Sequence, residues 1–295
     1  MIKITRLGHI TLQTADLECQ LAHYCEVIGL IVIAREPTRV HLASPTAGFA
    51  LVLERADTPR CAKLTLEAGG GSDLPALEKA LRARGLSPVA SRDPAPGIGQ
   101  ALSITDPDGM VVEVALPAKL SERAITTTGI AVEKLGHVAF NVGDVQRSVD
   151  FYTQILGFRV SDWQGDFFAF LRCCTDHHNV NFLPGAQRKM HHAAYELTDW
   201  DHVKRACDDL ARHRIRLIWG PLRHGVGHNI SIYHRDPDGH IVEMFTEMDR
   251  MTNEELGYFD PRPWHEDRPQ RPKVWEPCVE TSNMWGIPTP QAFRD

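Results

Sequence analysis

The chain has 295 residues, of which 43% are apolar and 24% charged, a balance typical of a globular protein of two ordinary domains. Its formal net charge of −6, without a basic run, gives no reason to expect a nucleic-acid partner, and no stretch approaches the ~20 apolar residues of a membrane span. The segment MIKITRLGHI lacks signal-peptide character and the seven cysteines form no disulfide pattern, so we expect a cytoplasmic protein with reduced thiols.

Two pairs of segments repeat along the chain at nearly the same offset. The segment RLGHITLQTADLECQLAHY, from Arg6, matches KLGHVAFNVGDVQRSVDFY, from Lys134. Further along, ITDPDGMVVEVA, from Ile104, matches HRDPDGHIVEMF, from His234. A fixed period of this kind indicates an internal duplication, so each half should fold in the same way.

Each half contains a second, weaker repeat. In the second half, a strand-like segment at 136–142 precedes a helical pattern that ends at Gly157, and short strands follow. A new strand at 191–197 then leads into a helical pattern at 199–214 and further strands, with tight DPDG turns between the last two. We therefore expect an α+β fold of two tandem domains, each built from two βαβββ modules.

The same patterns set the expected boundaries. The domains should span 1–118 and 130–250, and the remaining residues, 251–295, form a tail rich in Pro, Trp and Arg. We expect this tail to pack over the second domain. Its expected anchors are Trp264, Trp275 and Trp285.

This layout resembles the vicinal oxygen chelate superfamily, and within it the two-domain type I extradiol ring-cleavage dioxygenases, such as catechol and homoprotocatechuate 2,3-dioxygenases. The segment GPLRHGVGHNISIYHRDPDGHIVEMF, at 220–245, resembles their signature, in which RHG is followed by Tyr, a turn and a metal-binding Glu. The resemblance implies that each domain forms a curved, barrel-like mixed sheet around a pocket. It also implies a homo-oligomer that uses iron(II) and O₂ to open a catecholic ring to a muconic semialdehyde-type product in aromatic catabolism.

Three residues in the second half have the right chemistry and places for a metal site: His137, His192 and Glu243. Two imidazoles and one carboxylate form the facial triad of non-heme iron(II) oxygenases, which leaves positions open for substrate and O₂. Manganese(II) fits the same donors. Strand alternation allows only one of two adjacent histidines to face the site, and the family motif favours His192 over His191.

The duplication provides an internal control. His9 and Glu113 occupy two of the corresponding places in the first half, but the place of the middle ligand falls on Lys63. Likewise, Ser103 stands where the second half has Tyr233. We expect the first domain to have lost its metal site and to be structural.

Further site residues follow from the resemblance. His224 and Tyr233 match the family's histidine near the metal and its substrate-contacting tyrosine. An acid–base histidine is expected 14 or 15 residues before the middle ligand, at His178 or His177, and the following residues favour His178. Three others, His228, His234 and His240, are expected at the surface or in turns.

The predicted substrate contacts include Arg271, for which the sequence allows two interpretations. The tail segment RPWHEDRPQRPKVW resembles homoprotocatechuate-type tails, which would let Arg271 reach a substrate carboxylate, but it also suits an ion-paired surface arginine. Those enzymes carry an arginine where this chain has Trp219. Trp219 is therefore expected to line the pocket of an enzyme for a less charged, bulkier substrate.

Two other functions compete. A glyoxalase- or epimerase-like metalloenzyme of the same superfamily generally needs a fourth protein ligand, and the segment NVNFLPG at 179–185 offers no carboxylate there. A non-catalytic small-molecule binding protein would need no acid–base histidine beside the metal. Both alternatives are weaker than ring cleavage.

Overall fold

The computed structural model describes residues 3–46, 48–69, 71–118, 128–259 and 271–294. Contacts divide the chain into two compact units: Met1–Leu135 with Gln146–Phe158, and Gly136–Val145 with Arg159–Asp295. None of the helices in the described ranges is both long and apolar enough to cross a membrane.

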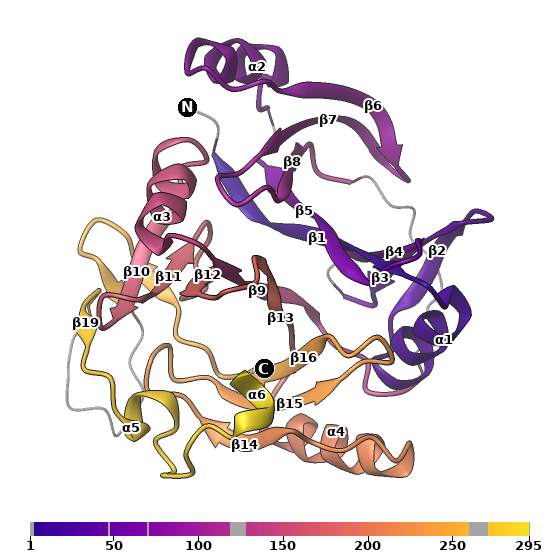
Figure 1. Ribbon diagram of the computed structural model, residues 1–295, viewed down its shortest axis with the longest axis vertical. Coiled ribbons are helices and arrows are strands. Elements are labelled where there is room, and N and C mark those ends of the chain that lie inside the picture. Colours follow the sequence, from indigo (N-terminus) through magenta and orange to yellow (C-terminus); the bar gives the residue numbers. More distant parts are fainter. Residues whose placement is uncertain (1–2, 47, 70, 119–127, 260–270, 295) are drawn as a thin grey trace. The chain divides into compact units, whose positions relative to one another are not determined.

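The first unit contains one eight-stranded sheet (Figure 1). Its elements are β1 (Ile4–Thr14), α1 (Leu17–Ala22), the π-helix η1 (His23–Val27), β2 (Ile31–Arg35), β3 (Arg39–Ser44), β4 (Gly48–Arg55), β5 (Arg60–Ala68), α2 (Leu74–Ala83), β6 (Val89–Ala95), β7 (Ile98–Thr105) and β8 (Val111–Ala115). The sheet order is β2-β3-β4-β1-β5-β8-β7-β6. The first strands of the two modules, β1 and β5, therefore lie side by side at its centre.

The second unit repeats this plan. Its elements are β9 (Lys134–Val142), β10 (Arg159–Gln164), β11 (Phe168–Arg172), β12 (Val180–Pro184), β13 (Lys189–Glu196), α4 (Trp200–Arg212), β14 (Trp219–Arg223), β15 (Ile230–Arg235), β16 (Ile241–Thr246), β17 (Met251–Asn253), β18 (Tyr258–Phe259), β19 (Val274–Trp275), α5 (Val279–Ser282) and α6 (Gln291–Arg294). The main sheet runs β14-β15-β16-β13-β9-β12-β11-β10-β19, again with the two module-opening strands, β13 and β9, as neighbours. The predicted succession of four βαβββ modules is confirmed.

One helix packs in a way that the repeat did not predict. Helix α3 (Val145–Gln154) follows β9 in the chain, yet all but its first residue belongs to the first unit. There Ser148 Oγ donates to Asp108 Oδ2 at 2.9 Å, and Tyr152 donates to Asp106 Oδ2 at 3.4 Å. The helix thus contacts the DPDG turn that joins β7 and β8.

Local sequence explains where the helices and turns occur. Asp199 caps α4 by accepting the backbone N–H of His202 at 2.8 Å, and the buried residues of this helix recur at helical spacing. Gly157, with φ of 76°, follows α3 in a conformation that suits glycine. In both of the predicted DPDG turns the glycine has positive φ, 91° at Gly109 and 85° at Gly239.

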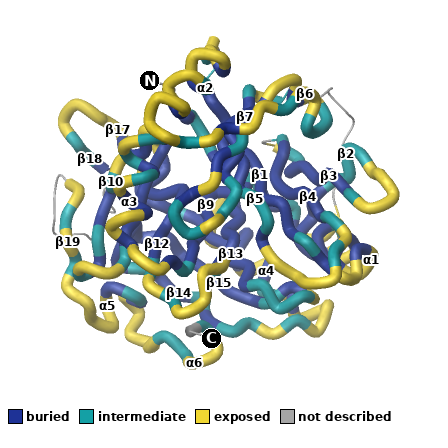
Figure 2. The backbone as a smooth tube through the Cα atoms, turned by 45° about the horizontal axis from the view of Figure 1, so that its top comes forward, coloured by how far each residue is buried: buried dark blue, intermediate teal, exposed yellow. Residues whose placement is uncertain are grey.

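Buried residues concentrate on the central strands of each sheet, which are dark blue in Figure 2, whereas the outer face of α2 is exposed. In the second unit, β9, β13 and β16 combine apolar residues with buried polar ones: His137, His192 and Glu243 are all at most 5% exposed. Buried polar side chains need hydrogen-bond or metal partners. The surroundings of these three residues therefore indicate what they bind.

Candidate metal centre and pocket

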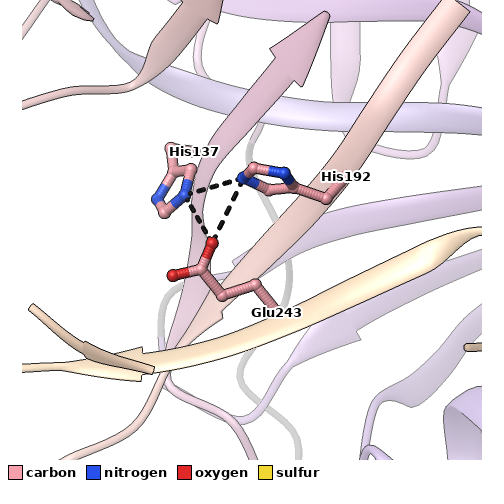
Figure 3. A group of neighbouring side chains, drawn as sticks. All are labelled: His137, His192 and Glu243. Carbon is pink, nitrogen blue, oxygen red and sulfur yellow. Dashed lines mark hydrogen bonds and ion pairs between the residues drawn. The ribbon is translucent and has the colours of Figure 1, made fainter. Parts of the chain in front are cut away.

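The predicted triad meets on three neighbouring strands of the second unit. His137 comes from β9, His192 from β13 and Glu243 from β16, and β16, β13 and β9 are consecutive in the sheet. Because side chains alternate between the two faces of a strand, one suitably placed residue on each strand brings all three to the same face. Figure 3 shows the three side chains pointing toward a common centre.

The donor atoms are spaced for a single ion. Glu243 Oε2 lies 3.0 Å from His137 Nε2 and 3.2 Å from His192 Nε2, and the two nitrogens are 3.4 Å apart. Two atoms bound at about 2.1 Å to one ion and at right angles would be about 3.0 Å apart. The three residues therefore fit a small divalent cation, and they are the one such group among the described residues.

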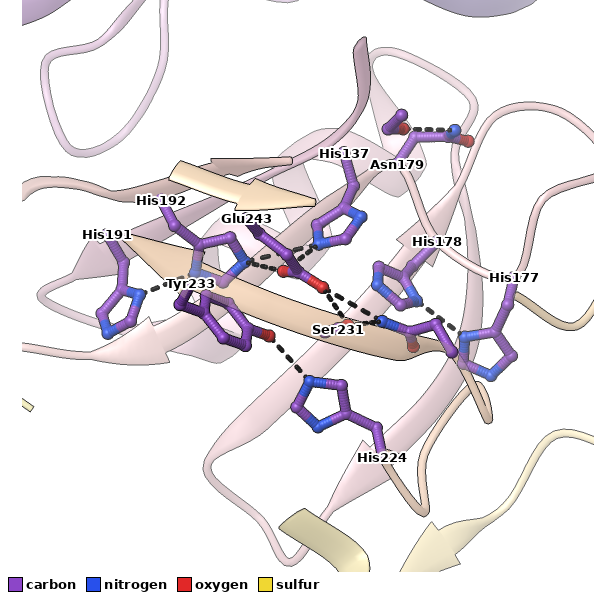
Figure 4. A network of polar contacts seen from close by, with 12 residues as sticks. His137, His177, His178, Asn179, His191, His192, His224, Ser231, Tyr233 and Glu243 are labelled. Carbon is purple, nitrogen blue, oxygen red and sulfur yellow. Dashed lines mark hydrogen bonds and ion pairs between the residues drawn. The ribbon is translucent and has the colours of Figure 1, made fainter. Parts of the chain in front are cut away.

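The two oxygens of Glu243 have different surroundings. Oε2 faces the two histidines, whereas Oε1 accepts from Ser231 Oγ at 2.6 Å and from Asn229 Nδ2 at 3.1 Å (Figure 4). Burial would raise the pKa of Glu243, but the charges and hydrogen bonds of His137 and His192 outweigh it and hold this pKa well below its ordinary value. The carboxylate is thus ionised and oriented before any ligand arrives.

The adjacent residues His191 and His192 form a hydrogen bond with each other, and only His192 belongs to the triad. His191 Nδ1 lies 2.7 Å from His192 Nδ1, and His191 also forms a hydrogen bond with the backbone of Phe293. Burial lowers the pKa of His191 to about 3, so its ring is neutral. A neutral His191 that gives its hydrogen to Phe293 accepts one from His192 Nδ1, which leaves His192 Nε2 as a lone pair toward the centre.

Tyr233 lies directly beside the triad. It pairs with Glu243 across the β15–β16 ladder. His224 Nδ1 faces the Ser282 carbonyl at 2.7 Å and donates to it, so Nε2 accepts from the Tyr233 hydroxyl, also at 2.7 Å. Burial lowers the pKa of His224 and raises that of Tyr233 well above its ordinary value, which keeps both groups neutral.

His178 approaches the centre from the other side. Its ring centroid lies 4.4 Å from that of His137 and 5.3 Å from that of Phe170, and its Nδ1 is 2.9 Å from His177 Nδ1. Burial, followed by the neighbouring His137 and His177, holds the pKa of His178 well below its ordinary value. His178 lines the pocket, whereas His177 is completely buried behind it.

The pocket over the triad is a cavity of about 620 Å³. Its apolar lining comes from several elements and includes Phe167, Phe168, Phe170, Leu183, Trp219, Val226 and Phe293. Trp219 stacks on Tyr233 with centroids 5.5 Å apart, and Phe293 of α6 lies 4.7 Å from each of these two rings. The C-terminal segment thus contributes to the wall of the pocket.

Other predicted residues lie elsewhere. Arg271 is exposed, with its guanidinium 5.1 Å from the Tyr258 ring centroid, and it does not line the pocket. The prediction of a surface or turn position is wrong for His234, which is completely buried within β15, whereas His228 lies in the loop between β14 and β15 but is also completely buried. His228 pairs with Asp249 far along the chain, a contact that local sequence does not reveal.

The tail anchors differ among themselves. Trp275 Nε1 donates to Asp162 at 2.7 Å, whereas Trp285 is 48% exposed and contacts Trp200 edge-on. Trp264 lies outside the described residues. Sequence reasoning also missed Ser231 and Asn229, although Ser231 shares a strand face with Tyr233 two residues away.

The first unit shows what stands in the corresponding places. Lys63 lies two residues before the strand partner of Glu113, just as His192 lies two before that of Glu243. Its Nζ is 2.9 Å from Glu113 Oε1, and Ser103 Oγ donates to Oε2 at 3.4 Å. The carboxylate is therefore paired with an ammonium group.

Comparison with known proteins agrees with this architecture. The model of the Glyoxalase/Bleomycin resistance protein/Dioxygenase superfamily matches residues 6–114 and 134–244. The chain is 28% identical to a metapyrocatechase of Pseudomonas sp. (strain CF600), over 82% of this chain and 86% of that protein. It is also 28% identical to the 3-methylcatechol 2,3-dioxygenase of Pseudomonas putida F1, over 82% and 89%.

A solved structure is similar over nearly the whole length. It is the Mn(II)-bound glyoxalase from Novosphingobium aromaticivorans, which is 29% identical and has a TM-score of 0.85. The similarity covers 99% of this chain and 94% of that one.

Proposed function

Because the chain belongs to the Glyoxalase/Bleomycin resistance protein/Dioxygenase superfamily, we propose that it is an extradiol dioxygenase. It would open the ring of a catechol beside the two hydroxyl groups and give a muconic semialdehyde-type product. The observation that carries this proposal is the His137–His192–Glu243 triad with acid–base and hydroxyl groups on both sides of it. Dioxygenases among its relatives support the same reaction class.

In this proposal His137, His192 and Glu243 hold iron(II), and manganese(II) is the alternative that the same donors accept. When bound, the ion supplies a Lewis-acidic centre that holds the catechol and O₂ together. Glu243, whose pKa is held well below its ordinary value, brings a negative charge that complements a divalent cation.

The neighbouring side chains handle protons. His178 lines the pocket and its lowered pKa keeps it neutral, so it would accept a proton from a catechol hydroxyl and return it later in the reaction. Acid–base catalysis of this kind contributes about 10²–10⁴-fold in rate. Tyr233, oriented by His224, would hydrogen-bond a substrate oxygen from the opposite side.

The pocket lining favours a neutral ring substituent. Trp219 and Phe293 place aromatic surface beside Tyr233, and the lining cation, Lys189, has an exposed side chain. Arg271 lies over the Tyr258 ring and is not among the lining residues that could meet a substrate carboxylate. We infer that alkyl- or aryl-substituted catechols are better substrates than carboxylated ones, because apolar surface gains from burial and an unpaired carboxylate loses.

A direct test loads the full chain anaerobically with iron(II) and then adds air with catechol, 3- and 4-methylcatechol, 2,3-dihydroxybiphenyl or homoprotocatechuate. We expect a visible ring-opened product from the neutral catechols and a lower kcat/KM for homoprotocatechuate. His192→Ala should lose activity, whereas His9→Ala, at the corresponding place of the first unit, should retain it. No product from any catechol, despite bound metal, would contradict the proposal.

A second candidate is a non-oxidative metalloenzyme, favoured by the similarity to a Mn(II)-bound glyoxalase. Isomerases of that kind would gain from a fourth protein ligand, but the group of potential metal ligands found among the described residues contains a single carboxylate, Glu243. The two candidates differ in their need for O₂. Turnover of a non-catecholic carbonyl substrate without oxygen consumption would favour the second.

A further inference from the structure

A buried carboxylate lies behind the pocket and is not part of the triad. Asp162 of β10 is 1% exposed and accepts three hydrogen bonds: from Lys273 N at 2.8 Å, from Trp275 Nε1 at 2.7 Å and from His177 Nε2 at 3.1 Å. The first two donors come from the C-terminal segment. A buried carboxylate with three N–H donors is a fixed acceptor, which determines the hydrogen positions of its neighbours.

The acceptor Asp162 determines which ring nitrogens of His177 and His178 carry hydrogen. Asp162 accepts a hydrogen from His177 Nε2, and in this tautomer the Nδ1 of His177 carries only a lone pair. This Nδ1 lies 2.9 Å from His178 Nδ1, so His178 Nδ1 must carry the hydrogen that joins them (Figure 4). The remaining lone pair of His178 is then on Nε2.

This contact is the one side-chain hydrogen bond of His178 within the described part of the chain. It is also sealed from solvent. His177 is completely buried, and a Cβ on Gly227 would lie 3.1 Å from His177 Nδ1 and 3.3 Å from His178 Cε1. Gly227 thus packs against both rings and leaves no room for a side chain beside them.

We propose that His177 and Asp162 are positioning residues that hold His178 in the Nδ1–H form, with its Nε2 lone pair toward the substrate pocket. A carboxylate that fixes the tautomer of an imidazole is a general device in metal and hydrolytic sites. Here a second imidazole lies between them and links His178, through Asp162, to Trp275. The catalytic consequence rests on the proposed function, but the tautomer does not.

The tautomer can be measured without turnover. Long-range ¹H–¹⁵N correlation spectra of the ¹⁵N-histidine-labelled full chain, loaded with zinc(II) as a diamagnetic ion, distinguish Nδ1–H from Nε2–H. Signals of His178 are assigned by their loss in His178→Ala. We expect the Nδ1–H form in the unmodified protein, and an Nε2–H form there would overturn the proposal, whether or not the enzyme cleaves catechols.

Two substitutions of His177 then separate positioning from packing. His177→Phe keeps a buried ring without nitrogen atoms, whereas His177→Asn places an amide oxygen near the position of Nδ1, where it can accept from His178. We expect His177→Phe to lower kcat about 10–100-fold, with KM and metal content nearly unchanged and the Nδ1–H form no longer dominant. His177→Asn should restore both the tautomer and most of kcat.

Equal kcat and an unchanged tautomer in His177→Phe would contradict the positioning role. Should the phenylalanine variant not fold, the spectrum of the unmodified protein and the asparagine variant still decide the question. An inactive unmodified enzyme with His178 in the Nδ1–H form would instead contradict the proposed function and leave the positioning pair supported.

Discussion

Glu243 directs its two oxygens to different partners, and this division defines the centre at the residue scale. Oε2 is shared by His137 and His192, whereas Oε1 is held by Ser231 and Asn229. Hydrogen bonds of this kind fix the direction of a ligand before the ion binds, which reduces the cost of ordering it. Substitution of Ser231 therefore tests whether the orientation of Glu243 contributes to metal binding.

Ser231→Ala should weaken metal binding about 10–100-fold, because Glu243 loses the 2.6 Å hydrogen bond that orients it. Anaerobic calorimetric titration with manganese(II) or iron(II) measures this change. The matched control is Ser103→Ala, which removes a hydroxyl 3.4 Å from Glu113 in the first unit and should not change the affinity. Equal affinities in all three proteins would show that Ser231 has no orienting role.

Asp106 provides a residue-scale test of pH dependence away from the metal. Burial raises its pKa above the ordinary 3.8, despite hydrogen bonds from the backbone N–H groups of Met110 and Asp108. The folded protein therefore binds more protons than the unfolded chain between these two pKa values. Its stabilising contribution is full below pH 3.8 and is lost as the pH rises through the folded pKa.

Asp106→Asn retains the acceptor oxygen and removes this titration. Relative to the variant, the unmodified protein should lose thermal stability as the pH rises from about 4 toward neutrality. Melting temperatures of both proteins across this range measure the difference. A gain of the unmodified protein over the variant with rising pH would reverse the sign and contradict the assignment.

At the scale of elements, β9 is fixed by a close approach. A Cβ on Gly136 would overlap the ring of Phe245, which itself packs against His137 with centroids 5.0 Å apart. The glycine thus allows β9 to present His137 while Phe245 fills the space beside it. A side chain at this position would push the aromatic ring toward the metal ligand.

Gly136→Ala should lower the free energy of unfolding by about 1–3 kcal/mol, as overpacking of a core does, and should weaken metal binding. Chemical denaturation of the metal-free protein measures the first effect and titration the second. Gly99→Ala serves as the control, because nothing lies within 4 Å of a Cβ built there. Unchanged stability and affinity in Gly136→Ala would mean that Phe245 moves aside freely.

The elements were largely predictable because their signals are local. Hydrophobic periodicity and the DPDG turns predicted four βαβββ modules, which the structure contains. Packing of α3 was not predictable in this way. Its contact with Asp108 joins residues 40 positions apart, and a repeat in the sequence does not specify which sheet a helix covers.

The site divides along the same line. The three residues of the triad could be predicted because the duplication allowed each half to be compared with the other. The comparison put Lys63 of the first half at the position of His192 in the second. The pair formed by Asp162 and Trp275 could not, since it joins residues 113 positions apart through a segment without periodicity. Burial of the loop residue His228 was not predictable, because its buried partner, Asp249, follows 21 positions later.

At the scale of the whole molecule, the two halves share a fold but differ in what holds their carboxylates. Glu113 is paired with the Lys63 ammonium, whereas Glu243 faces two imidazoles. A cation already occupies the place that a metal ion would take in the first unit. We therefore expect one ion per chain, bound in the second unit.

Elemental analysis after loading and desalting should give one iron or manganese per chain. Glu243→Gln should reduce this value to near zero, whereas Glu113→Gln should leave it unchanged, because the amide substitution preserves size and removes the charge in each half. Two ions per chain, or loss of metal in Glu113→Gln, would contradict the assignment of a single centre.

The most direct measurement for the account is the oxygen stoichiometry of the iron-loaded enzyme with 3-methylcatechol, followed with an oxygen electrode in parallel with the absorbance of the product. The account predicts one O₂ consumed for each ring-opened molecule, with no oxygen returned on adding catalase, because both atoms enter the product. Oxygen return by catalase, or turnover without oxygen consumption, would contradict ring cleavage by a dioxygenase.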